Sequence, residues 1–350
     1  MTFAAFSRHL ALALSLALLS ALLVRIMIGV RVMDRPDRRK SHSIPTPKSG
    51  GVGIVAAFLA GMYVLYRYAE FSRLADPYFR GVILASVAIA VVAFLDDLRD
   101  WPFTVKLAAQ IGAALTAVAS GLYVTDYHIP YIGPWQLGSL GIAATVVWIL
   151  FATNAMNFID GLNGLAAGTA LVAAVFLAAI AEGQGGWFVY FAALLLAAGL
   201  AGFLPYNFPR ARIFMGDVGS QFCGFVLAVL GVAAARFGAI EMSFLLVPML
   251  LSGVLLDVAF TLVRRAVAGQ RLTEAHRGHV YQVAQRAGIP APWVAVTHWG
   301  FAVFGGLCCL LFITAPAGGK PFVPLLVLIP QAGWLAIVRN RARKAGVNQW

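Results

Sequence analysis

The chain has 350 residues, of which 61% are hydrophobic and only 11% charged, and its mean hydropathy is +0.84. About a quarter of the residues in a soluble globular domain are charged, so this composition excludes one. The formal net charge of +12 does not indicate a nucleic-acid partner, because lysines and arginines gather in the cytoplasmic loops of membrane proteins and set their orientation. The sequence therefore predicts an all-α, polytopic integral membrane protein.

Apolar stretches long enough to cross a hydrocarbon core of roughly 30 Å recur from one end of the chain to the other. They predict about 10–11 transmembrane helices, at residues 5–30, 50–68, 79–95, 103–121, 139–157, 163–181, 187–205, 218–235, 242–263, 294–315 and 322–338. No polar segment between them is long enough to form a soluble core, so residues 1–350 are expected to form a single membrane-embedded catalytic domain.

The distribution of charge predicts an orientation. If the first stretch runs from outside to inside, most of the 26 lysines and arginines lie in or beside the inward loops, as the positive-inside rule requires. The outward loops are short, and the segment from Tyr123 to Leu140, rich in tyrosine, proline, glycine and tryptophan, predicts an irregular or hairpin element at the outer interface.

Polar residues that are costly to desolvate cluster on the predicted inward side. They are Asp96, Asp97, Asp100, Asn154, Asn157, Asp160, Asn163, Asn207 and Asp217. Such residues at the ends of membrane helices indicate a functional site. An anionic cluster beside basic loops is the arrangement expected when Mg²⁺ bridges protein carboxylates and a phosphorylated substrate.

Each motif also has a structural interpretation. The run from Asp96 to Asp100 could be a solvated helix end, and the arginines between Pro205 and Ser220 could extend to lipid headgroups. His276 and His279 have no accompanying set of zinc ligands, so contacts with substrate phosphate and sugar are favoured. Asp257 lies inside a predicted span and is expected to pair with an arginine.

Taken in order, the motifs FLDD, NAMNFIDGLNG, NFPRARIFMGDVGS and EAHRGHVYQ resemble those of the polyprenyl-phosphate N-acetylhexosamine-1-phosphate transferases of glycosyltransferase family 4. The resemblance spans most of the chain, and the loop from Asp34 to Gly51 is similar to the first cytoplasmic loop of that family. It is most like the enzymes that initiate O-antigen and other surface polysaccharides.

The resemblance implies transfer of an N-acetylhexosamine 1-phosphate from a UDP-N-acetylhexosamine to undecaprenyl (polyprenyl) phosphate, with release of UMP. The lipid-linked product would initiate O-antigen (lipopolysaccharide) or other cell-envelope synthesis. The implied cofactor is Mg²⁺, with Mn²⁺ as a substitute. The implied location is the bacterial inner (plasma) membrane, where membrane lipids surround the protein and the active site faces the cytoplasm. For the oligomeric state, the sequence is compatible with both a monomer and a homodimer.

The resemblance also assigns residues. The catalytic residues are Asp96, Asp97 and His279, and the metal ligands are Asp217 and Asn157. The nucleotide-sugar contacts are Asp160, Asn163, Asn207, Phe214, His276 and Arg277, and the phosphate-binding residues are Lys48 and Lys106. Direct attack by the lipid phosphate is favoured over a phospho-enzyme, because a phosphate monoester is largely dianionic near neutral pH.

The sequence departs from the family pattern at two places, and the second bears on the choice of sugar donor. Asn163 stands where many relatives carry an aspartate, which removes one charge. The HRGHVYQ segment differs from the three-histidine run of the muramoyl-pentapeptide enzyme, which favours UDP-N-acetylglucosamine or a 6-deoxy-N-acetylhexosamine as the sugar donor.

Two other classes fit part of the pattern. A membrane prenyltransferase would use Asp96 to Asp100 as a DDxxD motif, but a second aspartate-rich motif is missing from the sequence. A cation-coupled transporter would place its polar residues near the membrane midplane, whereas here they lie at one end of the spans. Neither the prenyltransferase nor the transporter is expected to release UMP from a UDP-sugar.

Overall fold

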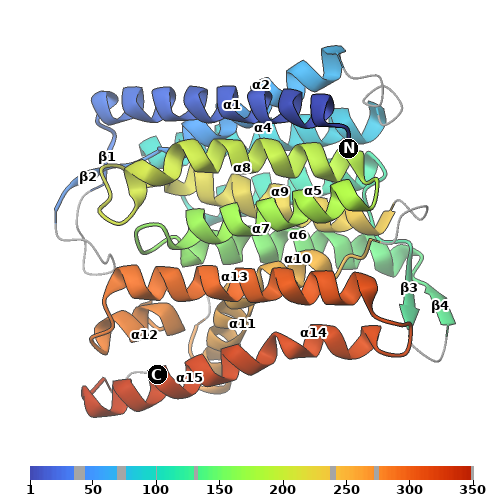
Figure 1. The fold of residues 1–350 in the computed structure, drawn as a ribbon. Helices are drawn as coiled ribbons and strands as arrows, with labels where there is room; N and C mark the ends of the chain where they lie inside the picture. Colours follow the sequence, from blue (N-terminus) through green and yellow to red (C-terminus); the bar gives the residue numbers. More distant parts are fainter. Residues whose placement is uncertain are drawn as a thin grey trace.

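The computed structural model describes residues 1–34, 44–68, 76–99, 101–129, 133–236, 242–271 and 276–347. Most of the long helices run side by side along one direction (Figure 1). The helices are α1 (Phe3–Val30), α2 (Gly51–Tyr68), α4 (Asp76–Arg99), α5 (Phe103–Ala119), α6 (Ser139–Ile159), α7 (Leu165–Gly183), α8 (Trp187–Asn207), α9 (Gly216–Arg236), α10 (Leu246–Leu250), α11 (Ser252–Val267), α12 (Val280–Arg286), α13 (Ala291–Thr314), the 3₁₀ helix η1 (Lys320–Phe322), α14 (Val323–Leu326) and α15 (Leu328–Lys344). The predicted all-α, multi-pass membrane fold is confirmed.

Nine of the predicted spans correspond to helices that are long and apolar enough to cross a membrane, counted over the described residues. The last of them, Lys320–Lys344, comprises η1, α14 and α15. A tenth predicted span corresponds to α5, which is shorter at 17 residues. Long apolar segments are therefore where the sequence placed them.

The predicted span at residues 242–263 is not one continuous helix, which corrects that expectation. α10 ends at Leu250 and α11 begins at Ser252, and Figure 1 shows α11 running steeply across the direction of its neighbours. Serine and glycine pairs are common sites of helix breaks, and Gly253 follows Ser252 here. A Cβ on Gly253 would come within 2.8 Å of the Phe301 ring of α13. Hydropathy does not detect such a break, because it registers only that the segment is apolar.

Four short strands form two antiparallel pairs. β3 (Asp126–Ile129) pairs with β4 (Gly133–Gln136), which confirms the hairpin predicted between Tyr123 and Leu140. β1 (Met33–Asp34) pairs with β2 (Thr46–Pro47) and joins the two ends of the first loop. Residues 35–43 of that loop lie outside the described residues, as does Asp100.

α9 lies at the centre of the helix bundle and contacts α2, α4 and α6. Of the residues in its apolar stretch 94% are buried, compared with 22% for α1 and 17% for Lys320–Lys344 at the edges. Gly51 at the start of α2 meets Gly219 of α9 so closely that a Cβ on Gly51 would collide with the α9 backbone. This contact holds the first turns of two helices together, and the candidate site lies there.

Candidate active site

Two adjacent carboxylates lie in the last turn of α4 and meet the first turn of α9. Asp97 Oδ1 accepts a hydrogen bond from the Asp217 backbone N–H (3.1 Å), and Asp97 Oδ2 accepts one from the Val218 N–H (3.5 Å). The first N–H groups of a helix have no partners within the helix, and the helix dipole favours negative charge there. Asp97 therefore caps α9 from a neighbouring helix. Gly216 has a φ of +73°, and a Cβ there would collide with the Asp97 carboxylate.

Lys106 of α5 joins the carboxylates of two helices. Its Nζ lies 2.9 Å from Asp96 Oδ2 and 3.1 Å from Asp217 Oδ2. The Trp101 N–H donates to Asp96 Oδ1 (2.8 Å). The Asp217 side chain is 25% exposed, compared with 6% for Asp96 and 4% for Asp97. Asp217 is therefore the most accessible of the three carboxylates, and a lysine neutralises it.

The segment before α2 brings a second lysine to the cluster. The Phe214 N–H donates to Pro47 O of β2 (2.8 Å), and Phe214 O accepts a hydrogen bond from the Gly50 N–H (2.9 Å). These two bonds fix the segment before α2 beside the segment that precedes α9. Ser49 Oγ then donates to Asp97 Oδ2 (3.0 Å), and Lys48 Nζ lies 3.9 Å from Asp97 Oδ1. Phe214 itself is half-buried. Residues of the predicted first loop thus contact the predicted carboxylates.

The end of α6 adds an amide and a carboxyl group to the cluster. Asn157 Nδ2 donates to Asp217 Oδ1 (3.0 Å) and to Ser220 Oγ (2.9 Å). Asp160 follows the last residue of α6. Burial and the nearby negative charges of Asp217 and Asp97 raise the pKa of Asp160 well above its ordinary range. A bound cation would lower that pKa again.

Two other predicted residues lie in the loops beside the cluster. Asn207 Oδ1 accepts a hydrogen bond from the Gly164 N–H (2.6 Å), and Asn207 Nδ2 donates to Ile213 O (2.9 Å). This buried amide therefore ties together the loops that follow α6 and α8. The half-buried Asn163 donates to Pro209 O (3.3 Å). Direct contact of either side chain with a nucleotide-sugar stays a prediction.

The histidine loop, which we define as residues 276–279, is organised by Asp257, which was expected to pair with an arginine. Asp257 of α11 accepts hydrogen bonds from the N–H groups of Val280 (3.0 Å) and Tyr281 (2.9 Å), the first residues of α12. His279 Nδ1 lies 3.1 Å from Asp257 Oδ1. The ring of His276 stacks on that of His279 with centroids 4.9 Å apart. Asp257 thus fixes both the helix start and the buried histidine.

The histidine loop also contacts the end of α6. Tyr281 Oη donates to Phe158 O (3.0 Å), and the Phe158 ring lies 5.9 Å from that of His279. The Arg277 carbonyl oxygen accepts a hydrogen bond from Arg286 Nη1 (3.3 Å). The structure therefore brings the histidine loop and the carboxylate cluster to the same end of α6.

Burial is the main cause of a lowered pKa in the histidine loop. Together with the neighbouring His279, Arg265 and Arg264, burial lowers the pKa of His276 to about 4, against a partial opposing effect of Asp257. His276 is therefore neutral at physiological pH and can accept a hydrogen bond. Its Nδ1 already accepts one from the Gly278 N–H (3.1 Å).

Two buried glutamines behind Asp217, Gln110 and Gln221, were not among the predicted site residues. Gln221 Nε2 donates to Asp217 Oδ2 (3.0 Å), and Gln110 Nε2 donates to Gln221 Oε1 (2.9 Å). Asn154 Nδ2 in turn donates to Gln110 Oε1 (2.7 Å). The available signal was the presence of two glutamines inside otherwise apolar helices. This chain of hydrogen-bonded amides orients the Asp217 carboxylate.

The donor set of the cluster fits Mg²⁺. Over the described residues, no group of three or more histidine, cysteine, aspartate or glutamate side chains is close enough to hold a metal by itself. Mg²⁺ is usually held by one or two carboxylates together with substrate phosphates and water. The accessible oxygen donor Asp217, with Asn157 beside it, is suited to that mode.

Fold and cluster together define a polytopic membrane protein with a site suited to phosphate groups and a divalent cation. The family model described as Glycosyl transferase family 4 matches residues 79–235, which contain most of the cluster. A probable undecaprenyl-phosphate N-acetylglucosaminyl 1-phosphate transferase of Bacillus subtilis (strain 168) is 30% identical over 270 residues, covering 77% of this chain and 74% of that protein.

Two further relatives are enzymes that act on related substrates, as their names state. A decaprenyl-phosphate N-acetylglucosaminephosphotransferase of Mycobacterium tuberculosis (strain ATCC 25618 / H37Rv) is 31% identical, covering 76% of this chain and 74% of that protein. A phospho-N-acetylmuramoyl-pentapeptide-transferase of Acetivibrio thermocellus is 29% identical, covering 60% and 66%. The chain belongs to the polyprenyl-phosphate N-acetylhexosamine-1-phosphate transferase family and is a membrane-embedded transferase.

Proposed function

We propose that this protein transfers an N-acetylhexosamine 1-phosphate from a UDP-sugar to undecaprenyl phosphate. The observation that carries the proposal is the cluster of Asp96, Asp217 and Lys106, joined by contacts of 2.9 and 3.1 Å at the ends of three helices. Its alternating charges suit a reaction between phosphate groups. The names of the relatives, which include polyprenyl-phosphate N-acetylglucosamine-1-phosphate transferases, support the same reaction.

In the proposed reaction, an oxygen of the lipid phosphate attacks the phosphorus that carries the sugar. The bond from that phosphorus to the bridging oxygen of the diphosphate breaks, and UMP leaves with the bridging oxygen. The lipid phosphate needs no strong base, because it is largely dianionic at neutral pH. Positioning and neutralisation of charge are then the main requirements.

We assign the residues of the cluster from their contacts. Lys106 and Lys48 bind phosphate oxygens, and Asp96 and Asp97 hold these lysines in place and accept any proton that the lipid phosphate still carries. Asp217, with Asn157, holds Mg²⁺, which when bound neutralises the diphosphate and stabilises the leaving UMP. We assign His276, Arg277 and His279, whose loop lies near the end of α6, to the sugar and its phosphate, and Phe214 to the uracil.

The assignments of the sugar, of the pathway and of the cellular location rest on the motifs and on the charge distribution. We propose N-acetylglucosamine, or a 6-deoxy relative of it, as the sugar, and initiation of O-antigen or another cell-envelope polysaccharide as the role. We further propose that the site lies at the cytoplasmic face of the bacterial inner membrane, a location that the basic loops support.

The test is to incubate purified protein with undecaprenyl phosphate, Mg²⁺ and a panel of UDP-N-acetylhexosamines, and to follow UMP and lipid-linked sugar together. We expect equal amounts of both products with one sugar, and neither product when the lipid is omitted or Mg²⁺ is chelated. Folded protein that yields neither product across the panel, beside an active relative as control, would argue against the proposal.

A further inference from the structure

Three helices carry polar side chains in two successive layers at the site. The outer layer lies in the first or last turn of α5, α6 and α9, and its members are joined by contacts of 3.1 and 3.0 Å. It consists of Lys106, Asn157 and Asp217. About one helical turn further from these ends, each helix contributes a side-chain amide to an inner layer. This inner layer, which we call the amide layer, consists of Gln110, Asn154 and Gln221.

The hydrogen bonds of the amide layer run in one direction, toward Asp217. Asn154 Nδ2 donates to Leu150 O (2.8 Å) and to Gln110 Oε1 (2.7 Å). Gln110 Nε2 donates to Gln221 Oε1 (2.9 Å), and Gln221 Nε2 donates to Asp217 Oδ2 (3.0 Å). A carbonyl oxygen and an ionised carboxylate can only accept hydrogen bonds. The two ends of the series therefore fix the orientation of every amide between them, because a reversed amide would set one acceptor against another.

The amide layer is buried, yet stability alone does not explain it. Gln110 and Gln221 are each 3% exposed. Burying an amide is costly unless it is hydrogen-bonded, and hydrogen bonds between membrane helices stabilise a bundle only modestly. Apolar side chains of similar size, in place of both partners of a hydrogen bond, would be nearly as stable. Unlike an apolar side chain, however, the amide layer directs an N–H group at the Asp217 carboxylate.

Two side-chain nitrogens lie within hydrogen-bond distance of Asp217 Oδ2. Lys106 Nζ lies 3.1 Å from this oxygen and 2.9 Å from Asp96 Oδ2, and the proposed function assigns it to substrate phosphate. A lysine that turns toward a phosphate leaves its carboxylate without that partner. Gln221 Nε2, at 3.0 Å, is held from behind by Gln110. The Gln221 contact is therefore the one that can persist while substrate is bound.

We propose that Gln110 and Gln221 are positioning residues that keep the Asp217 carboxylate in one orientation while Lys106 binds substrate phosphate. This inference rests on the proposed function, from which it takes the roles of Lys106 and Asp217. Gln221 acts through Asp217, and Gln110 acts through Gln221. Side chains that orient a metal-binding residue contribute about ten- to a hundredfold to metal affinity or activity.

The test measures cation binding separately from turnover. The purified full chain in detergent is titrated with Mn²⁺ in the presence of UDP, the part common to all candidate donors, and bound Mn²⁺ is followed by electron paramagnetic resonance. The midpoint of thermal unfolding and the Mg²⁺ concentration for half-maximal UMP release are measured on the same samples. Gln110→Leu leaves Gln221 and Asn154 each without one partner, whereas Gln110→Leu/Gln221→Leu removes both glutamines.

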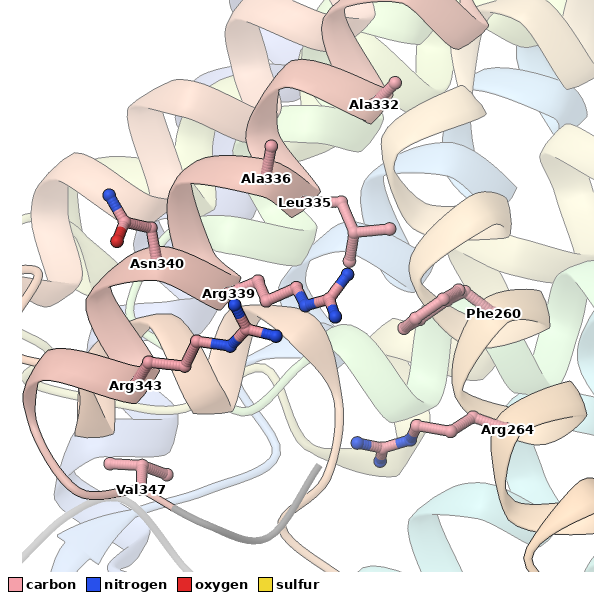
Figure 2. A pocket seen from close by; sticks show the side chains of 9 residues that line it. All are labelled: Phe260, Arg264, Ala332, Leu335, Ala336, Arg339, Asn340, Arg343 and Val347. Atoms are coloured by element: carbon pink, nitrogen blue, oxygen red, sulfur yellow. The ribbon is translucent and has the colours of Figure 1, made fainter.

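The control variant is Gln331→Leu, the same substitution in a helix that contributes to neither layer. Gln331 lies in α15, which borders a cavity of about 860 Å³ against α11 (Figure 2). None of the residues that line this cavity belongs to either layer. Among the described residues, Gln331 Nε2 has no hydrogen-bond partner. The control should therefore keep wild-type Mn²⁺ binding and turnover.

We expect Gln110→Leu to unfold at a lower temperature than the wild type and to bind Mn²⁺ about tenfold more weakly. The double variant should recover most of the loss in unfolding temperature, because removing both partners of a hydrogen bond leaves fewer unpaired amides than removing one. Its Mn²⁺ binding should stay weaker by about tenfold or more, because Asp217 has lost its amide partner. Its Mg²⁺ requirement should rise in parallel.

Two outcomes would overturn the proposal. Mn²⁺ binding that recovers together with the unfolding temperature in the double variant would show that the amides only pack the helices. Wild-type Mn²⁺ binding by Gln110→Leu would show that Asp217 keeps its orientation without them. Both outcomes differ from a failure of the proposed function, in which the wild type itself would release no UMP.

Discussion

Two helices of this protein begin in the same way but in different electrostatic surroundings. α9 is capped by Asp97 of α4, and α12 is capped by Asp257 of α11, each through two backbone N–H groups. The first turn of α9 carries a second carboxylate, Asp217, whereas His279 at the start of α12 contacts the capping carboxylate itself.

The difference shows which of the two capping carboxylates lies in surroundings whose charges are not fully matched within the protein. At α12, the aspartate and the histidine satisfy each other, and both are buried. At α9, two carboxylates repel each other and depend on Lys48 and Lys106 for neutralisation. A cation or a phosphate that enters near α9 therefore finds partners whose charges are only partly matched within the protein, while the carboxylate that caps α12 is already paired with His279.

The largest expected effect follows from removing the accessible carboxylate at α9. Asp217→Ala should lower Mg²⁺-dependent release of UMP by about a thousandfold or more, because several kcal/mol of charge stabilisation are lost with the cation. The exposed hairpin variant Asp126→Ala is the control and should keep wild-type turnover. Wild-type turnover by folded Asp217→Ala protein would remove Asp217 from the cation-binding role.

The second prediction compares the two capping carboxylates. Asp257→Asn should lower the free energy of unfolding by about 2–3 kcal/mol, because charge-assisted hydrogen bonds to His279 and to two N–H groups are weakened. Asp97→Asn should cost only about 1 kcal/mol, because it also relieves repulsion with Asp217. Denaturant unfolding in mixed micelles measures both. A larger loss for Asp97→Asn would reverse the comparison.

The third prediction isolates the contact between Gly216 and Asp97. Gly216 and Gly288 both have a positive φ, at +73° and +86°, but a Cβ at Gly216 would meet the Asp97 carboxylate and the Ser49 backbone nitrogen, whereas one at Gly288 has no neighbour within 4 Å. Gly288→Ala should cost about 1 kcal/mol from the backbone alone, and Gly216→Ala about 2 kcal/mol. Equal losses in thermal unfolding would show that the groups around Gly216 move aside without cost.

The smallest effect concerns pH and the histidine loop. The pKa of His276 is lowered from 6.5 to about 4, so below pH 6.5 the unfolded chain binds a proton that the folded protein does not. Stability should therefore fall as the pH drops from about 6.5 toward about 4. His276→Gln should flatten this part of the stability profile and leave it unchanged above pH 7. An identical acid slope in the variant would contradict the prediction.

Much of the fold and of the site could be predicted from the sequence. The motif residues Asp97, Asn157 and Asp217 do meet, and the hairpin and ten of the spans lie where they were expected. The site residues that sequence reasoning missed, Gln110 and Gln221, belong to no motif, and their importance follows only from the hydrogen bonds that they make across helices.

By itself, the sequence determined the membrane class, the positions of ten spans and the motifs of the family, because apolarity and motif spacing are properties of local sequence. Tertiary structure alone decided the break between α10 and α11, the capping role of Asp257 and the pairing of Lys106 with two carboxylates. These features depend on contacts between distant residues: Asp97 meets Ser49 and Asp217, which are 48 and 120 positions away. Such contacts are fixed by how helices pack, which local sequence does not specify.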